Sequence, residues 1–87
     1  KALVLNSEYV LALCNRAAIY HVREQYGEAL ADLNKAYNLD KLNPSILLNR
    51  GITKEMLRDE EGACEDWSKA GDLGLKQGQI YYMKNCE

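Results

Sequence analysis

The chain has 87 residues, with 11 basic and 13 acidic side chains and a formal net charge of -2 at pH 7. The two signs of charge alternate and no lysine and arginine cluster exists, so we expect no nucleic-acid partner. No apolar run approaches the roughly 18 to 20 residues of a membrane span and no signal-like segment opens the chain, so we expect a soluble protein without a membrane partner. Its compartment, cytoplasmic or periplasmic, stays open.

The first half of the sequence predicts two helices of different character. Residues 1–9 resemble the end of a helix, because KALVLN at 1–6 mirrors KAYNLD at 35–40. A new helix is predicted from Ser7 or Glu8 to Arg23, with Ser7 as its N-cap. It is apolar nearly all round, which is typical of a helix that is covered on several sides. The next helix, over 26–39, keeps one apolar stripe and therefore a wet outer face.

The second half predicts another pair. Asn43 is the expected N-cap of a helix over 44–57, with Pro44 at its first position. Asp59 is the expected N-cap of a helix that ends near Leu73, before a glycine. Trp67 is predicted to fill the space between these two helices.

The tail over 76–85 predicts a fifth helix. Its stripe, to which Ile80 is adjacent, suits a capping helix that covers the open face of the last pair. The stripe consists of Gln79, Tyr82, Met83 and Cys86.

An internal repeat relates 10–43 to 44–77. A unit of this length is typical of a helix–turn–helix that cannot bury its own apolar face and is stabilised by stacking on neighbours. Eight positions agree: Leu13, Asn15, Arg16, Ala29, Asp32, Lys35, Ala36 and Leu39 match Leu47, Asn49, Arg50, Ala63, Asp66, Lys69, Ala70 and Leu73.

The order of these residues resembles the tetratricopeptide repeat family. It is carried by Leu13, Arg16, Ala17, Tyr20, Ala29, Leu33 and Ala36, and by Leu47, Arg50, Gly51, Ala63, Trp67 and Ala70. The resemblance implies an all-α solenoid of antiparallel helix pairs, with the first (A) helices inside, the second (B) helices outside, and a C-terminal capping helix. It also implies a scaffold for protein interactions. Lys54 and Glu60 depart from the pattern, because they replace tyrosines.

The resemblance divides the chain into the end of a preceding repeat (1–9), two repeats (10–43 and 44–77) and the capping helix (78–87). Two repeats are fewer than the three that an array usually needs, so we expect a C-terminal piece of a longer protein. The ending around Cys64 and Trp67 resembles the final repeat of many bacterial members.

Three cysteines are present, without the spacing of a zinc site or a disulfide framework. We expect no metal or other cofactor, and read the cysteines as small core side chains. The resemblance implies that Cys64 and Cys86 could meet beneath the cap. In a reducing compartment we expect a packing contact between them rather than a disulfide.

Two arginine–aspartate pairs recur at matching positions, Arg16 with Asp32 and Arg50 with Asp66. We expect each pair to fix an A helix to its B helix. The alternative is that the arginines capture an acidic ligand.

The inward stripe of the A helices predicts a largely apolar groove for a protein or peptide partner. Part of this stripe could instead be ordinary apolar core between the two repeats. Asn15 and Asn49 either bind the backbone of the partner or satisfy a neighbouring helix. The family's clamp for an acidic C-terminal tail needs basic residues beside such an asparagine. Those positions are occupied here by Leu11, Cys14, Ser45 and Leu48, so we do not expect an acidic tail as the ligand. The expected binding residues are Leu11, Cys14, Asn15, Ala18, His21, Val22, Ser45, Leu48, Asn49, Ile52, Glu55 and Met56.

We expect no enzyme. Cys14 and His21 share a face but are separated by about 10.5 Å of helix rise, whereas a working pair needs roughly 2.6 to 3.2 Å. The leading interpretation is a module that binds a partner protein. The alternative is a structural repeat without a separate ligand, which self-associates through its N-terminal edge.

Overall fold

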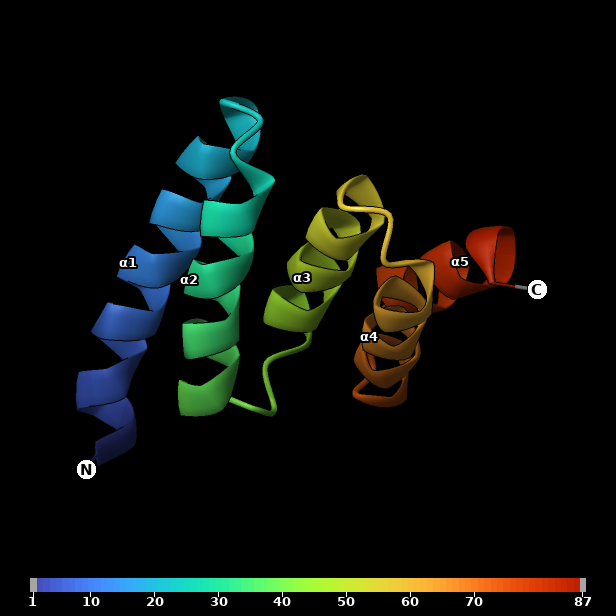
Figure 1. Ribbon diagram of the computed structural model, residues 1–87. Coiled ribbons are helices and arrows are strands. Elements are labelled where there is room, and N and C mark those ends of the chain that lie inside the picture. Colours follow the sequence, from blue (N-terminus) through green and yellow to red (C-terminus); the bar gives the residue numbers. More distant parts are fainter. Residues whose placement is uncertain (1, 87) are drawn as a thin grey trace.

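The structure is a computed structural model that describes the backbone of residues 2–86 and the side chains of residues 8–86. Within this range the chain is all helical, as predicted. The helices are α1 (Ala2–Val22), α2 (Tyr26–Leu39), α3 (Pro44–Met56), α4 (Glu60–Asp72) and α5 (Lys76–Asn85). Each helix packs on the next one in the chain, so they form a row of antiparallel hairpins (Figure 1).

Helix α1 begins earlier than the sequence predicted. It runs without a break from Ala2, so Ser7 lies inside the helix and is not its N-cap. The segment before Ser7 contains no glycine or proline that would end a helix, and its leucines and alanine favour one. The assignment of residues 1–9 to a preceding repeat stays a prediction.

The second hairpin has the predicted caps. The Asn43 side chain accepts a hydrogen bond from the Ser45 N–H at 3.0 Å, and Pro44 is the first residue of α3. The Asp59 carboxylate accepts one from the Gly62 N–H at 3.1 Å at the start of α4. These contacts satisfy N–H groups that have no partner within the helix.

The turns inside the two hairpins have the same backbone conformation. Glu24 in the first turn and Arg58 in the second hold matching positions of the repeat, and both are left-handed, with φ of 61° and 70°. Side chains other than glycine rarely adopt this region. The repeat is therefore preserved in the backbone even where the residues differ.

The two helices of the second hairpin meet at Gly51 and Trp67. A Cβ atom on Gly51 would lie 2.5 Å from Nε1 of the Trp67 indole. The indole is 1% exposed, and its Nε1–H donates to the Leu48 carbonyl at 3.4 Å. The prediction that Trp67 fills the space between these helices is confirmed.

Helix α5 covers α4, in part through the predicted stripe, because the Gln79 amide donates to the Gly71 carbonyl at 3.4 Å and Cys86 is bonded to Cys64. A Cβ atom on Gly78 would lie 2.7 Å from the Ala70 Cβ, so glycine permits the contact between these helices. The Tyr81 ring packs against Trp67, whereas Tyr82 and Met83 of the predicted stripe are exposed. The predicted stripe is therefore confirmed at Gln79 and Cys86, and it was wrong to leave out Tyr81.

Cys64 and Cys86 form a disulfide, so the prediction of a mere packing contact was wrong. The docking of α5 on α4 brings their Cα atoms to 5.9 Å, within the range of about 4.4 to 6.8 Å that a disulfide spans. The bond fixes the end of α5 to α4. Cys14 is the one free cysteine of the described part of the chain.

The position of Trp67 predicts the effect of its removal. We expect Trp67→Ala to lower the free energy of unfolding by about 3 to 5 kcal/mol, because the missing indole leaves a cavity between α3, α4 and α5. Chemical denaturation followed by circular dichroism measures this change. A loss below about 1 kcal/mol would mean that the hairpin repacks around the gap.

Candidate functional site

Large apolar side chains are exposed on the A helices and α5, but not on the B helices. Among the described side chains, α2 and α4 expose no large apolar residue. Three exposed ones, Leu42, Leu57 and Leu73, lie in turns. Those on α1, α3 and α5 are Tyr9, Leu11, Ile19, Val22, Met56, Ile80, Tyr82 and Met83. The exposed apolar side chains of the helices are thus unequally distributed between the A helices with α5 and the B helices.

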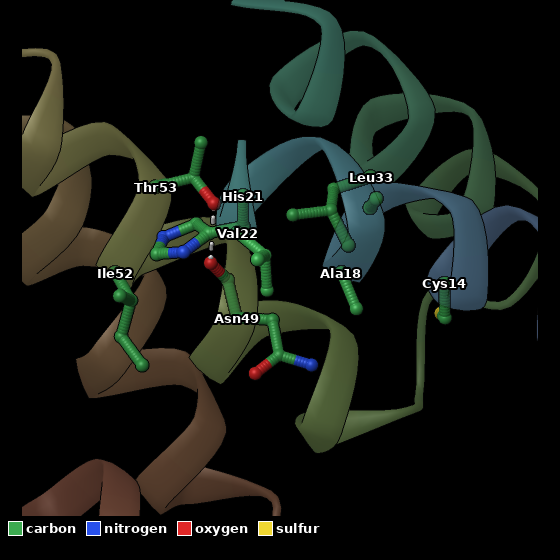
Figure 2. Close-up of a pocket in the computed structure, with 9 residues that line it drawn as sticks. Cys14, Ala18, His21, Val22, Leu33, Asn49, Ile52 and Thr53 are labelled. Carbon is green, nitrogen blue, oxygen red and sulfur yellow. Dashed lines mark hydrogen bonds between the residues drawn. The ribbon is translucent and has the colours of Figure 1, made fainter. Parts of the chain in front are cut away.

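A cavity of about 340 Å³ opens between α1, α2 and α3. Figure 2 shows Asn49 and Ile52 of α3 facing Ala18 and Val22 of α1 across it. Six of the twelve predicted binding residues line this cavity, and three further residues that were not predicted complete its wall. The six are Cys14, Ala18, His21, Val22, Asn49 and Ile52, and the three are Ala17, Leu33 and Thr53.

The three unpredicted residues are buried side chains that belong to the core as well as to the cavity. Ala17 and Leu33 pack together with Ala29 between α1 and α2. Thr53 is fully buried, and its hydroxyl donates to the Asn49 carbonyl at 3.0 Å. The only signal in the sequence was the presence of these residues on apolar faces, and that signal does not distinguish a core position from a cavity wall.

The other six predicted residues lie outside the cavity. Leu48 is partly buried, and the remaining five are exposed on α1 and α3. Glu55 instead lines a smaller cavity of about 120 Å³ beside Trp67 and Asn85. The residues outside the larger cavity are Leu11, Asn15, Ser45, Leu48, Glu55 and Met56.

His21 and Cys14 in the cavity wall are not arranged for catalysis. The His21 ring packs edge-on against Tyr26 at 4.9 Å, and its Nε2 atom is buried without a hydrogen-bond partner. Burial, and next the nearby Asp40 carboxylate, raise the pKa of the Cys14 thiol. The thiol is therefore protonated at neutral pH, whereas a nucleophilic cysteine must be a thiolate.

The two repeated asparagines have free amides in the described part of the chain. The side chains of Asn15 and Asn49 are exposed and form no hydrogen bond with residues 8–86. The alternative that they satisfy groups on a neighbouring helix is therefore not realised. Each amide offers one acceptor and two donor hydrogens to a ligand.

Both arginine–aspartate pairs are ion pairs between an A helix and its B helix, as predicted. Nε and one terminal nitrogen of Arg16 each donate to the Asp32 carboxylate at 2.8 Å. Arg50 forms the same two bonds with Asp66 at 2.8 Å. The two bonds to an aspartate favour the interpretation that each arginine fixes an A helix to its B helix over capture of an acidic ligand.

The two pairs differ in their surroundings. The Arg50 side chain is 13% exposed, because the Tyr37 ring covers it at 4.3 Å and Asn34 accepts a bond from it. The Arg16 side chain is 57% exposed. The bond with Arg16, opposed in part by burial, lowers the pKa of Asp32, and the bond with Asp66 raises the pKa of Arg50.

Residues 2–86 include no group of three histidine, cysteine, aspartate or glutamate side chains that could hold a metal ion. None of the helices described is both long and apolar enough to cross a membrane.

One comparison connects the chain to known proteins. Over 57 residues, 66% of this chain, the sequence is 37% identical to human tetratricopeptide repeat protein 6. The chain spans 11% of the length of that protein. No family model and no solved structure matches the chain. The similarity and the all-helical row of hairpins support a tetratricopeptide-like helical repeat. The predicted bacterial source stays a prediction.

The Asp32 pair predicts a pH dependence of stability. The folded-state pKa of Asp32 lies below its unfolded value, so its contribution is present above about pH 4 and is lost as the pH falls through the folded pKa. We expect Asp32→Asn to lower the free energy of unfolding by about 1 to 2 kcal/mol at pH 7, and by less in acid. Urea titrations at several pH values measure this difference.

The matched control is Asp72→Asn, because the Asp72 carboxylate is exposed and forms no ion pair with the described residues. We expect little change at any pH. A cost of Asp32→Asn that stays constant down to pH 2 would contradict the stabilising role of the ion pair.

Proposed function

We propose that this tetratricopeptide-like repeat recruits a partner protein by binding one of its segments in the groove lined by α1 and α3. The observation that supports the proposal most is the gathering of exposed apolar side chains on the A helices while the B helices expose none. Burial of that surface by a partner would supply affinity at about 25 cal/mol per Å² of apolar area, before the costs of association.

The polar groups of the groove suit the backbone of a bound segment. Asn15 and Asn49 hold matching positions on α1 and α3, and both amides are free. An extended chain exposes N–H and C=O groups that such amides can bind, whereas a helix has already paired most of its own. We therefore propose an extended segment, with apolar side chains that enter the groove and a backbone that the asparagines hold.

The charges of the groove argue against a strongly acidic partner. Arg16 and Arg50 are occupied by aspartates, and the groove residues named above include one charged side chain, Glu55. We propose that the segment is apolar and neutral or basic.

A charge placed at the cavity tests the proposal. Val22 lines the cavity and is 83% exposed, so Val22→Asp should fold while placing a carboxylate in the apolar groove. We expect at least a tenfold loss of affinity for proteins that the unaltered protein captures, since a charge resists transfer to an apolar contact. Quantitative pull-down with the longest available form of the protein measures it.

The control is Asn38→Asp, which adds the same charge to the exposed outer face of α2. It should leave capture unchanged. Equal capture by the unaltered protein and Val22→Asp would remove the groove from consideration.

Self-association through α1 is a second candidate, favoured by one specific comparison. Ile19 on α1 is 53% exposed, whereas Thr53, its counterpart on α3, is fully buried. Arg16 is likewise more exposed than Arg50, which α2 covers. The face of α3 that carries Thr53 and Arg50 is thus covered by a neighbouring helix, whereas the matching face of α1 is open. A second molecule of this protein could cover that open face.

Sedimentation analysis at rising concentration tests this candidate. If two copies pair through α1, we expect the average mass to rise with concentration, and Ile19→Asp to abolish the rise while Asn38→Asp does not. A mass that stays that of a monomer would reject self-association and leave partner binding as the function.

A further inference from the structure

We call the place where a helix hairpin packs on the helix that follows it a junction. The structure contains two junctions, the first formed by α1, α2 and α3 and the second by α3, α4 and α5. Helices α2 and α4 correspond at the spacing of the repeat. Helix α5 begins at Lys76 rather than at Gly78, the position that the repeat matches to Pro44, because a shorter turn precedes it. This earlier start places Gly78 on Ala70, just as Ile46 clusters with Ala36, the counterpart of Ala70.

The two junctions are filled differently. At the first, Leu33 and Asn49 line the cavity of about 340 Å³. Their counterparts at the second are Trp67 and Tyr81, whose rings lie 5.2 Å apart. The second junction retains a cavity of about 120 Å³.

The small cavity overlaps the same space in part. Glu55, Trp67 and Asn85 of its wall are the counterparts of His21, Leu33 and Thr53 in the large cavity, whereas the rest of its wall is formed by Glu60, Ala63 and Cys64. An aromatic ring from α5 therefore occupies, at the second junction, the region that stays open at the first.

We propose that the large cavity at the first junction is a binding site for an aromatic side chain, tyrosine or phenylalanine, of a partner segment. The ring would lie on Leu33 of α2, as the Tyr81 ring of α5 lies on Trp67 of α4. This inference rests on the proposed function and states which side chain anchors the partner in the groove.

The cavity walls suit a ring. Leu33, Ala18, Val22 and Ile52 give the cavity an apolar lining, and Figure 2 shows Ile52 on the side away from Leu33 and Ala18. The Cys14 sulfur lines the same wall, and sulfur contacts favourably with the edge of an aromatic ring. The exposed Asn49 amide can bind a phenol oxygen or the adjacent backbone. Burying a ring supplies much of the energy at protein interfaces.

Free side-chain analogues test the chemistry of the cavity directly. The probe is p-cresol, the tyrosine side chain as a free molecule, added to the isotope-labelled protein and followed by NMR. We expect shifts of the backbone amides of Ala18, His21, Asn49 and Ile52, with a Kd of about 1 mM. The aliphatic probe 3-methylbutan-1-ol should bind at least fivefold more weakly.

Variants that copy the second junction supply the control. Asn49→Tyr, alone or with Leu33→Trp, should fill the cavity and abolish the shifts with p-cresol, and Asn49 is exposed, so the single variant should fold. Asn38→Tyr adds the same ring to the exposed outer face of α2, away from the cavity, and should leave the binding of p-cresol intact.

Three outcomes would overturn the proposal: no saturable shifts with p-cresol, equal binding of the aliphatic alcohol, or unchanged binding by Asn49→Tyr. In each case loss of partner capture by Val22→Asp would still stand, so the groove could bind partners without an aromatic anchor. If p-cresol binds as expected but Val22→Asp captures partners normally, the proposed function fails, and the aromatic anchor that rests on it fails with it.

Discussion

The close approach of each A helix to its B helix is the constraint on which the rest of the structure depends. Gly51 allows Trp67 to lie against α3, and fully buried alanines hold the same spacing along α2 and α4. Because helices this close bury only the faces that meet, the remaining apolar residues of the A helices stay outside the core. The candidate binding surface is therefore a consequence of how the hairpins pack.

The ion pairs fix the orientation that this packing leaves free. Two parallel bonds from Arg50 to Asp66 define both the distance and the rotation between α3 and α4. The same geometry between α1 and α2 gives both hairpins one shape, although their core residues differ. The ion pairs are the same in both hairpins, whereas the side chains at the two junctions differ. The first junction therefore holds a cavity of about 340 Å³ and the second one of about 120 Å³.

The sequence predicted what depends on short-range periodicity, namely the hairpins, the caps at Asn43 and Asp59, and the Arg–Asp pairs. It did not predict what depends on turns and distances. The shorter turn before α5 starts this helix two residues earlier than the repeat spacing implies, about 200° around a helix, and the sequence pattern did not indicate that Tyr81 lies on Trp67. Six of the nine residues that line the cavity were predicted, because they lie on the inward stripe of the A helices. Leu33 and Thr53 were not predicted, because the sequence pattern does not distinguish them from core residues.

The disulfide makes the two junctions unequal in a way that bears on binding. Cys64 and Cys86 are 22 residues apart, and closing a loop of that size stabilises the fold by about 3 kcal/mol on the chain-entropy account. The bond holds α5, and with it the Tyr81 ring, on Trp67. The second junction therefore keeps its own ring in place. Since no described side chain fills the first junction in this way, the partner that we propose would not have to displace part of the protein, and its ring would lie in a space whose walls are already formed.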